Sequence, residues 1–389
     1  MRTLLHLQGE LIYAGPLLLV QVLLARRAMR RWPGFRRVFQ ILAAVPFLLE
    51  LFGMPQFGGR VRLPDAFVFC IQLWLYCSTA AFVVIKIGEL LSQRSAPRPV
   101  TPAPAATSVD SRRRDLILTA AYAVAAVPVG ALLYGSFVER EKFGVSEVNL
   151  RILNLPPDFE GFRMLQISDV HRSAFLSQKD LRRVVDAAVG TKPDLILHTG
   201  DFISIQGDPL EHCLDELARL EAGYGVLGCL GNHEVYAEVQ DYATRYAARK
   251  GIRILRSQNQ VIERGGSRIN IAGVDYQTFA TRKNYIPGAE KLLMPGMVNV
   301  LLSHNPDVFP MASRKGFDVT LAGHTHGGQV RFEILNADID FARFYTPYVS
   351  GAYYENGRVC YVTRGVGSIG VPSRLGSPPE ISLLRLSRA

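Results

Sequence analysis

Five short polar segments constrain the fold of this chain more than any other feature, because each directly follows an apolar run of strand length. In chain order the segments are Asp169-Val170-His171, Gly200-Asp201, Gly231-Asn232-His233-Glu234, His304, and Gly323-His324-Thr325-His326. Apolar runs of roughly four to eight residues are typical of buried strands. Open α/β sheets place their ligand sites just beyond the carboxyl ends of such strands. The pattern predicts an α/β fold, two packed sheets with flanking helices, in which these segments form one site.

The polar segments contain five of the eight histidines of the chain. Asp169 and His171 are two residues apart, so their side chains point to the same side of an extended stretch, and His324 and His326 repeat this spacing. The Asp201 carboxylate has two oxygens and can bridge two cations. Carboxylate, amide and imidazole groups together suit Mn²⁺, Fe or Zn²⁺. The sequence thus predicts a metal site. The alternative, that these histidines only fill a core, leaves their convergence without a reason.

The first 138 residues are rich in leucine, alanine, valine and phenylalanine and differ from the rest of the chain. Two stretches, 66–85 and 116–138, contain no charged residue, and each is long enough to cross a hydrocarbon core of about 30 Å at about 1.5 Å per residue. Two weaker spans, near 4–25 and 38–56, are each interrupted by one glutamate. We therefore expect about four transmembrane helices before the α/β domain.

These spans predict the domain organisation. We expect three transmembrane helices in residues 1–91, a cytoplasmic Pro/Ala-rich linker in 92–114, a fourth helix in 115–138, and the catalytic domain in 139–389. The linker has no apolar periodicity, which is typical of a flexible spacer. The C-terminal part, roughly 250 residues, is long enough to bury a substantial core by itself.

The distribution of arginine predicts the orientation in the membrane. Arginines concentrate in the connectors at 26–37 and 94–114, whereas the loop between the second and third spans has only Arg60 and Arg62. The positive-inside rule puts the two arginine-rich connectors in the cytoplasm. The chain is thus expected to be a multi-pass protein of the cell (inner) membrane, with its catalytic domain on the extracytoplasmic side. Topology also accounts for much of the net charge of +10, so no nucleic acid partner is expected.

In order and spacing, the polar segments resemble the calcineurin-like metallophosphoesterases, whose motifs read D-x-H, G-D, G-N-H-E, H and G-H-x-H. The resemblance covers residues 165–329, and every ligand position of the motifs is occupied. The tail, in Arg364–Gly367, Val371–Arg374 and Ser377–Ile381, is similar to the membrane-associated bacterial branch of that superfamily. The resemblance implies a four-layer α/β/β/α sandwich.

The resemblance also implies two divalent metal ions, with Mn favoured over Fe or Zn. The implied ligands of one ion are Asp169, His171 and His326, those of the other are Asn232, His304 and His324, and Asp201 is the bridge. In such a site a hydroxide between the metals attacks phosphorus in line, and both metals neutralise charge on the phosphoryl oxygens.

Four further residues are candidates for roles at the site. The resemblance makes His233 the residue that faces the phosphate and stabilises the transition state or protonates the leaving oxygen. Glu234 is expected to orient His233 or to support the ligands. Arg172 is either a contact to a phosphate or lipid headgroup or a solvated surface residue. Arg374 is a second candidate for contact with the substrate.

Together these features predict a membrane-anchored, metal-dependent hydrolase of phosphodiesters or phosphomonoesters. Because the fourth span ends close to the catalytic domain, the lipid bilayer is an expected partner, and a phospholipid or another lipid-linked ester is an attractive substrate. A soluble nucleotide or phosphoprotein is the second enzymatic alternative. A third alternative, from a different class, is a catalytically silent metal-binding sensor or scaffold on a membrane bundle. The intact ligand set favours an enzyme, since silent relatives are expected to lose ligands.

Overall fold

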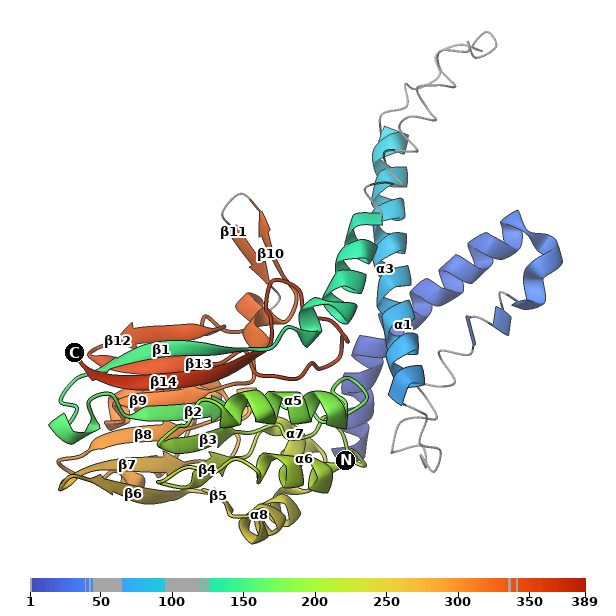
Figure 1. Cartoon of the computed structure of the whole chain (residues 1–389). Helices are drawn as coiled ribbons and strands as arrows, with labels where there is room; N and C mark the ends of the chain where they lie inside the picture. Colours follow the sequence, from blue (N-terminus) through green and yellow to red (C-terminus); the bar gives the residue numbers. More distant parts are fainter. Residues whose placement is uncertain are drawn as a thin grey trace. The chain divides into compact units, whose positions relative to one another are not determined.

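The computed structural model divides into two compact units between Ser136 and Phe137 (Figure 1). The residues that the structure describes are 2–38, 40–41, 43–44, 65–94, 120, 123, 126–334, 337–340 and 342–389. Most of the predicted second span, most of the linker and the first part of the predicted fourth span lie outside these ranges. The predicted domain boundaries remain predictions.

The N-terminal unit contains two 30-residue helices, α1 (Arg2–Arg31) and α3 (Asp65–Arg94). Within α3, Val68–Ile87 has a mean hydropathy of 2.0, and among the described residues this is the one helix that is long and apolar enough to cross a membrane. It coincides with the predicted span at 66–85. The expected number of four transmembrane helices is therefore not confirmed.

The C-terminal unit is built on two six-stranded sheets and one two-stranded sheet (Figure 1). The first sheet has the order β1 (Gly144–Ile152), β14 (Glu380–Arg388), β2 (Arg163–Ile167), β3 (Leu195–Thr199), β4 (Val226–Cys229), β5 (Ile252–Ile254). The second has the order β12 (Gly351–Glu355), β13 (Arg358–Val362), β9 (Val319–Ala322), β8 (Val298–Leu302), β7 (Ser267–Gly273), β6 (Gln258–Arg264). The small sheet pairs β10 (Arg331–Ile334) with β11 (Ala337–Asp340).

Each polar segment follows an apolar strand, as the sequence predicts. In the first sheet β2, β3, β4 and β5 pair in parallel, and in the second sheet β7, β8 and β9 do so. Parallel strands have their carboxyl ends at one edge of the sheet. The polar segments of each sheet therefore emerge together.

Strand β2 is buried on both faces, which explains its continuous apolar run. Met164 belongs to the apolar cluster between the two sheets, which also contains Ile269 and Val300 of the second sheet. Leu165 belongs to the cluster on the outer face of the first sheet, where helices cover it. Burial of both faces removes the alternation of polar and apolar residues that marks an exposed strand.

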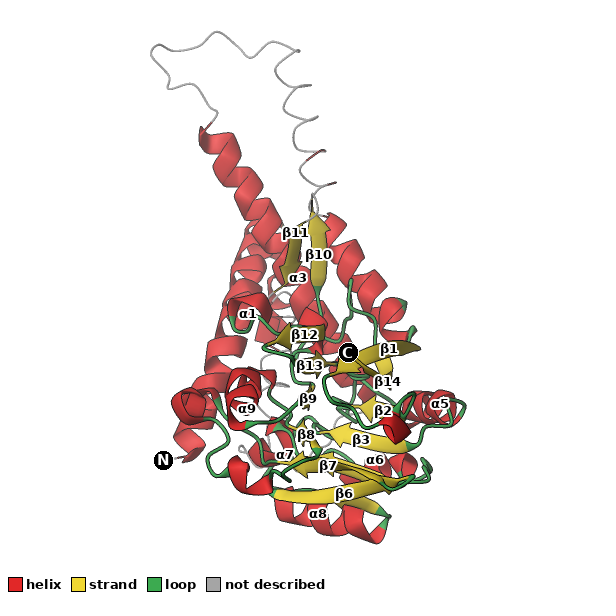
Figure 2. Ribbon diagram, turned by 90° about the vertical axis from the view of Figure 1, so that its left-hand side faces the viewer, coloured by secondary structure: helices red, strands yellow, loops and turns green. Residues whose placement is uncertain are grey.

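Helices cover the outer faces of both sheets. The helices on the first sheet are α5 (Gln178–Val189), α6 (Leu210–Leu217) and α8 (Gln240–Arg249). Helix α9 (Phe309–Lys315) packs on the second sheet through Ala312. Figure 2 shows α5 and α9 on opposite sides of the paired sheets. The predicted arrangement of two sheets with flanking helices is confirmed.

A side-chain hydrogen bond caps the start of α5. The side chain of Ser177 accepts a 3.1 Å hydrogen bond from the backbone N–H of Asp180. This bond satisfies one of the N–H groups that the first turn of a helix leaves without a partner. The apolar stripe of α5 is buried and consists of Leu181, Val184, Val185 and Ala188.

Candidate metal centre

All five polar segments converge at the carboxyl ends of central strands. The predicted ligands follow their strands in this order: Asp169 and His171 after β2, Asp201 after β3, Asn232 after β4, His304 after β8, and His324 and His326 after β9. Each sheet thus contributes to the site, and packing of the two sheets brings the contributions together.

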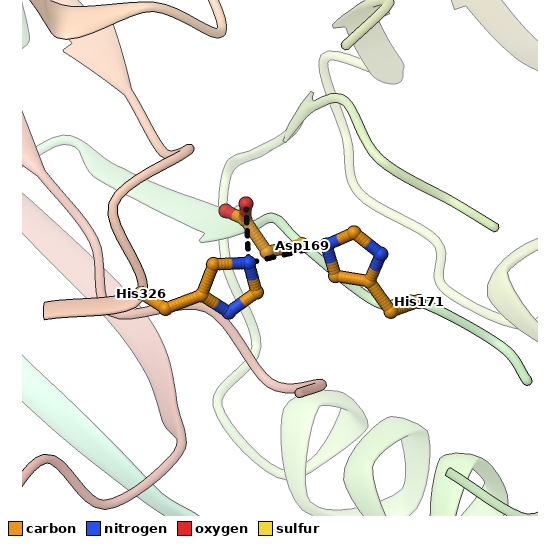
Figure 3. Close-up of side chains that lie close together, drawn as sticks. All are labelled: Asp169, His171 and His326. Atoms are coloured by element: carbon orange, nitrogen blue, oxygen red, sulfur yellow. Dashed lines mark hydrogen bonds and ion pairs between the residues drawn. The ribbon is translucent and has the colours of Figure 1, made fainter. Parts of the chain in front are cut away.

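One group of donor atoms comes from Asp169, His171 and His326 (Figure 3). His326 Nε2 lies 3.4 Å from Asp169 Oδ1 and 3.1 Å from His171 Nε2. Asp201 adjoins this group, because its Oδ2 lies 3.4 Å from His171 Nε2. Metal–ligand bonds of about 2.0–2.2 Å keep neighbouring donors about 3–3.5 Å apart, so these spacings suit a metal ion.

A second group comes from His304, His324 and Asn232, again with Asp201. Asp201 Oδ2 lies 3.1 Å from His304 Nε2, and Asn232 Oδ1 lies 2.9 Å from His324 Nδ1. Donor atoms of Asp201, His304 and His324 all lie within 4.8 Å of one another. The carboxylate of Asp201 therefore belongs to both groups.

Hydrogen bonds on the outer side of two imidazoles determine which nitrogen faces the donor groups. His304 Nδ1 lies 2.6 Å from the carbonyl oxygen of Thr199, which can only accept, so Nδ1 carries a proton and Nε2 is left for the site. This Nε2 is buried and lies 3.1 Å from Asp201 Oδ2. His171 Nδ1 similarly lies 3.2 Å from Ser204 Oγ. Outer partners of this kind orient imidazoles that bind metals.

Three of the imidazoles are held neutral. Burial, with a contribution from the neighbouring His233, keeps the pKa of His171 well below its usual value. Burial and the nearby Arg374 do the same to the pKa of His326, and burial lowers the pKa of His324 to about 3. A neutral imidazole is the form that binds a metal, so these rings need no deprotonation.

Two groups hold protons that a metal must displace. Burial raises the pKa of Asp169 to about 6. Burial alone would lower the pKa of His304, but the carboxylate of Asp201 raises it to about 9. Burial likewise opposes ionisation of Asp201, yet the surrounding imidazoles hold its pKa well below the usual range.

We expect the affinity for a divalent metal to increase with pH in two steps. Below about pH 6 the metal displaces protons from both Asp169 and His304, between about 6 and about 9 from His304 alone, and above that from neither. Calorimetric titration of metal-stripped protein with Mn²⁺ in buffers of different ionisation enthalpy measures both affinity and proton release. An affinity that stays constant across this range would contradict the expectation.

The backbone of the site adopts unusual conformations. Five predicted ligands have positive φ between 46° and 75°, namely Asp169, His171, Asp201, His324 and His326. Residues other than glycine adopt this left-handed region at a cost of about 1–3 kcal/mol each, which the surrounding structure must offset. Strain of this kind gathers at functional sites, so the backbone itself points to these residues.

Two glycines allow the segments to approach closely. A Cβ on Gly231 would overlap the carboxylate of Asp201, and a Cβ on Gly323 would overlap that of Asp169. Gly231 has a φ of −100°, so it is required for space, whereas Gly200 has a φ of 93° and forms a left-handed turn. Gly200 is therefore explained by a turn, and Gly231 by the close approach of Asp201.

Comparison with known proteins identifies the domain. The family model of the calcineurin-like phosphoesterases matches residues 162–328, a range that includes every predicted ligand. The chain carries a calcineurin-like phosphoesterase domain. The metallophosphoesterase YkuE of Bacillus subtilis is 29% identical over 263 residues, which cover 66% of this chain and 90% of the relative. The phosphodiesterase YaeI of Escherichia coli is 29% identical over 285 residues, which cover 71% and 99%.

The chain is also similar to a vertebrate protein, over a larger share of its length. The transmembrane protein with metallophosphoesterase domain of Danio rerio is 28% identical over 320 residues, which cover 78% of this chain and 68% of the relative. The names of these relatives support a metal-dependent phosphoester hydrolase. The resemblance predicted from the motifs is confirmed.

Within the phosphoesterase domain, Glu234 holds two ligand segments together. Its fully buried carboxylate accepts hydrogen bonds from the backbone N–H groups of Gly231 (2.8 Å), Asp201 (3.0 Å) and Phe202 (2.7 Å). Burial raises the pKa of Glu234, and these donors stabilise its ionised form. Of the two predicted roles of Glu234, this geometry favours support of the ligands over orientation of His233.

His233 lies beside the ligands and is half-buried. Its backbone N–H donates a 2.9 Å hydrogen bond to Asp201 Oδ1, and its Nδ1–H donates to the carbonyl oxygen of Ser204. One of its ring nitrogens lies within 4.8 Å of donor atoms of His171 and Asp201. With Nδ1 engaged, Nε2 is the nitrogen available for proton transfer.

Both arginines predicted to contact the substrate are buried. Arg172 is 8% exposed and donates 2.8 Å hydrogen bonds to the carbonyl oxygens of Ser173 and Leu176. Arg374 is 0% exposed and donates to the carbonyl oxygens of His326 (2.8 Å) and Gly367 (2.9 Å). These contacts argue against substrate contact and favour a role in fixing the loops that carry the ligands.

Of the C-terminal loop, the sequence prediction included only Arg374 in the site, and it did not include the glycines at 365 and 367. The backbone N–H of Gly367 donates a 2.7 Å hydrogen bond to the carbonyl oxygen of Asp169, and a Cβ on Gly365 would overlap the Asp169 side chain. The sequence prediction used the tail motif as a mark of a family branch and as the source of Arg374, and it did not predict the contact of this loop with Asp169. Thr199 and Ser204 gave no signal, because polar residues near strand ends are common.

Proposed function

We propose that this chain is a membrane-anchored phosphoesterase that binds two divalent metal ions and hydrolyses a phosphodiester or phosphomonoester. The observation that carries the proposal is the position of Asp201, whose carboxylate belongs to two groups of donor atoms. Bridging carboxylates of this kind hold pairs of metals in phosphoryl-transfer sites. The oxygen and imidazole donors suit Mn, Fe or Zn, and Mn is favoured because of the resemblance to the metallophosphoesterases.

The proposed mechanism divides the work between the two donor groups and His233. When bound, the metals would supply a nucleophile from water and neutralise charge on the phosphoryl oxygens. His233 would stabilise the transition state or give a proton to the leaving oxygen through Nε2, because its Nδ1 is held by Ser204. The Glu234 carboxylate would fix the position of Asp201 relative to the segment of Asn232, because it accepts hydrogen bonds from the backbone of both segments.

The favoured substrate is a lipid-linked ester at the extracytoplasmic face of the cell membrane. An apolar helix at Val68–Ile87 and a relative named as a transmembrane protein support membrane association. The proposed number of spans rests on the apolar stretches of the sequence, and the proposed outward orientation rests on the arginine distribution. Labelling of a cysteine introduced at Lys250 in intact cells tests the orientation, and labelling that requires permeabilised cells would contradict it.

The test of the activity is hydrolysis of bis-(p-nitrophenyl) phosphate and of p-nitrophenyl phosphate by the full chain in detergent, with Mn²⁺ added. We expect turnover that disappears with a chelator and with His324→Asn. The matched control is His212→Asn, which changes an exposed histidine outside the site and should retain full turnover. Two bound metals without turnover on aryl or lipid esters would favour the silent sensor or scaffold instead.

A further inference from the structure

A cavity of about 530 Å³ adjoins the metal centre of the phosphoesterase domain. His324 forms part of its wall, and so does Tyr276, whose ring centroid lies 5.7 Å from that of His324. The volume is within the range of about 300–1,000 Å³ that is typical of sites for small ligands. A group bound in this cavity would therefore lie next to a phosphoryl group held at the centre.

The charge of the cavity wall limits what this group can be. Among the described residues that line the cavity there is no lysine or arginine, and the one carboxylate is that of Asp307. Asp307 forms no ion pair with the described residues, although it is more than half buried. A second phosphate in the cavity would meet this negative charge without a counterion. A cationic group would supply the counterion that Asp307 lacks.

The position of Asp307 is fixed by neighbours that also line the cavity. Its carboxylate accepts a hydrogen bond from Thr346 Oγ1, and its backbone N–H donates a 3.0 Å hydrogen bond to Asn305 Oδ1. The charge therefore stays in the wall of the cavity instead of swinging into solvent. Preorganised charges of this kind contribute more to selectivity than mobile ones.

Two tyrosines add a second attraction for cations. Tyr276 is held by the histidines, with its ring centroid also 6.0 Å from that of His304, and Tyr345 lines the same cavity from the segment that follows η9 (Ala342–Phe344). Tyr345 is 78% exposed, so part of the cavity wall is in contact with solvent. Aromatic faces attract ammonium groups, most strongly where water is partly excluded.

We propose that this cavity binds the leaving alcohol of the substrate and selects an alcohol that carries an amine or quaternary ammonium group, which rests on the proposed function of the domain. In the reaction, water adds to phosphorus and the bond between phosphorus and the oxygen of the cationic alcohol breaks. The alcohol leaves with a proton on that oxygen, and a phosphomonoester remains. The same chemistry is offered by a soluble diester and by a lipid headgroup.

The test compares diesters that differ only in the charge of the alcohol. With the full chain and Mn²⁺, we expect KM for glycerophosphoethanolamine to be at least about tenfold lower than KM for glycerophosphoglycerol. Asp307→Asn should remove this preference, because asparagine keeps an oxygen that accepts from Thr346 but loses the charge. Vesicles of phosphatidylethanolamine and phosphatidylglycerol form the second arm, which distinguishes a lipid headgroup from a soluble diester.

A control and a binding measurement separate this inference from the proposed function. Glu290→Gln removes an exposed carboxylate that pairs with Lys315 and should retain the preference. Choline binding, measured by calorimetry, should weaken at least about tenfold in Asp307→Asn even if no ester is hydrolysed. Equal KM values for the two diesters, or choline binding that is independent of Asp307, would overturn the inference. Absence of turnover with Asp307-dependent choline binding would contradict the proposed function alone.

Discussion

Asp201→Asn is expected to lower kcat by about a thousandfold or more, which corresponds to about 4 kcal/mol of transition-state stabilisation. The substitution removes one oxygen and the negative charge from the side chain that lies 3.4 Å from His171 Nε2 and 3.1 Å from His304 Nε2. The remaining amide oxygen can bind one metal at most, so the bridge between the two proposed metals is lost. Metal analysis after dialysis should fall from two ions per chain to one or none, in parallel with turnover.

The matched control for this substitution is Asp186→Asn. Asp186 is also an aspartate in the phosphoesterase domain, but its side chain is 55% exposed and pairs with Arg219 at the surface. Surface pairs contribute about 0–1 kcal/mol, so turnover and metal content should stay unchanged. Full metal content and full turnover in Asp201→Asn would contradict the assignment of Asp201 as the shared ligand.

Glu234→Ala is expected to destabilise the phosphoesterase domain by about 3–5 kcal/mol. The Glu234 carboxylate is the buried acceptor for four backbone N–H groups, so its loss leaves them without this partner and leaves a cavity. For a domain of this size the loss corresponds to a decrease in Tm of roughly 10 °C, measurable by scanning calorimetry.

An intermediate variant and a surface control test whether the decrease in Tm comes from the lost carboxylate. Glu234→Gln keeps one acceptor oxygen, so its Tm should lie between those of the wild type and the alanine variant. Glu221→Ala changes an exposed glutamate of the same domain and should shift Tm by little. A Tm of Glu234→Ala within about 2 °C of the wild type would show that water replaces the carboxylate at little cost.

The strand order of the first sheet could not be predicted from the sequence. Strand β14, the last of the chain, lies between β1 and β2, parallel to one and antiparallel to the other. Its apolar sequence is compatible with several positions in the sheet, because the sequence of a strand that is buried on both faces does not indicate which strands pair with it. Only the packing of the complete sheet determines where β14 is inserted. This insertion brings the C-terminal loop into contact with Asp169, to which Gly367 donates a backbone hydrogen bond.

The two arginines illustrate a similar limit. An arginine near a predicted phosphate site suggests contact with phosphate, and Arg172 and Arg374 both met that criterion. Burial of Arg374 among backbone carbonyl oxygens depends on loops that are distant from it in sequence. No local pattern distinguishes a guanidinium that binds a ligand from one that satisfies the main chain.

What the sequence determined by itself is the chemistry of the site and the class of the fold. The type and order of the donors, from Asp169 to His326, follow from short motifs at strand ends, where local spacing is enough to predict a metal site. The tertiary structure decided which imidazole nitrogen faces the site, which φ angles are left-handed, and that a cavity with a lone carboxylate adjoins His324. These properties depend on contacts between residues far apart in the chain, and such contacts form only when both sheets are packed.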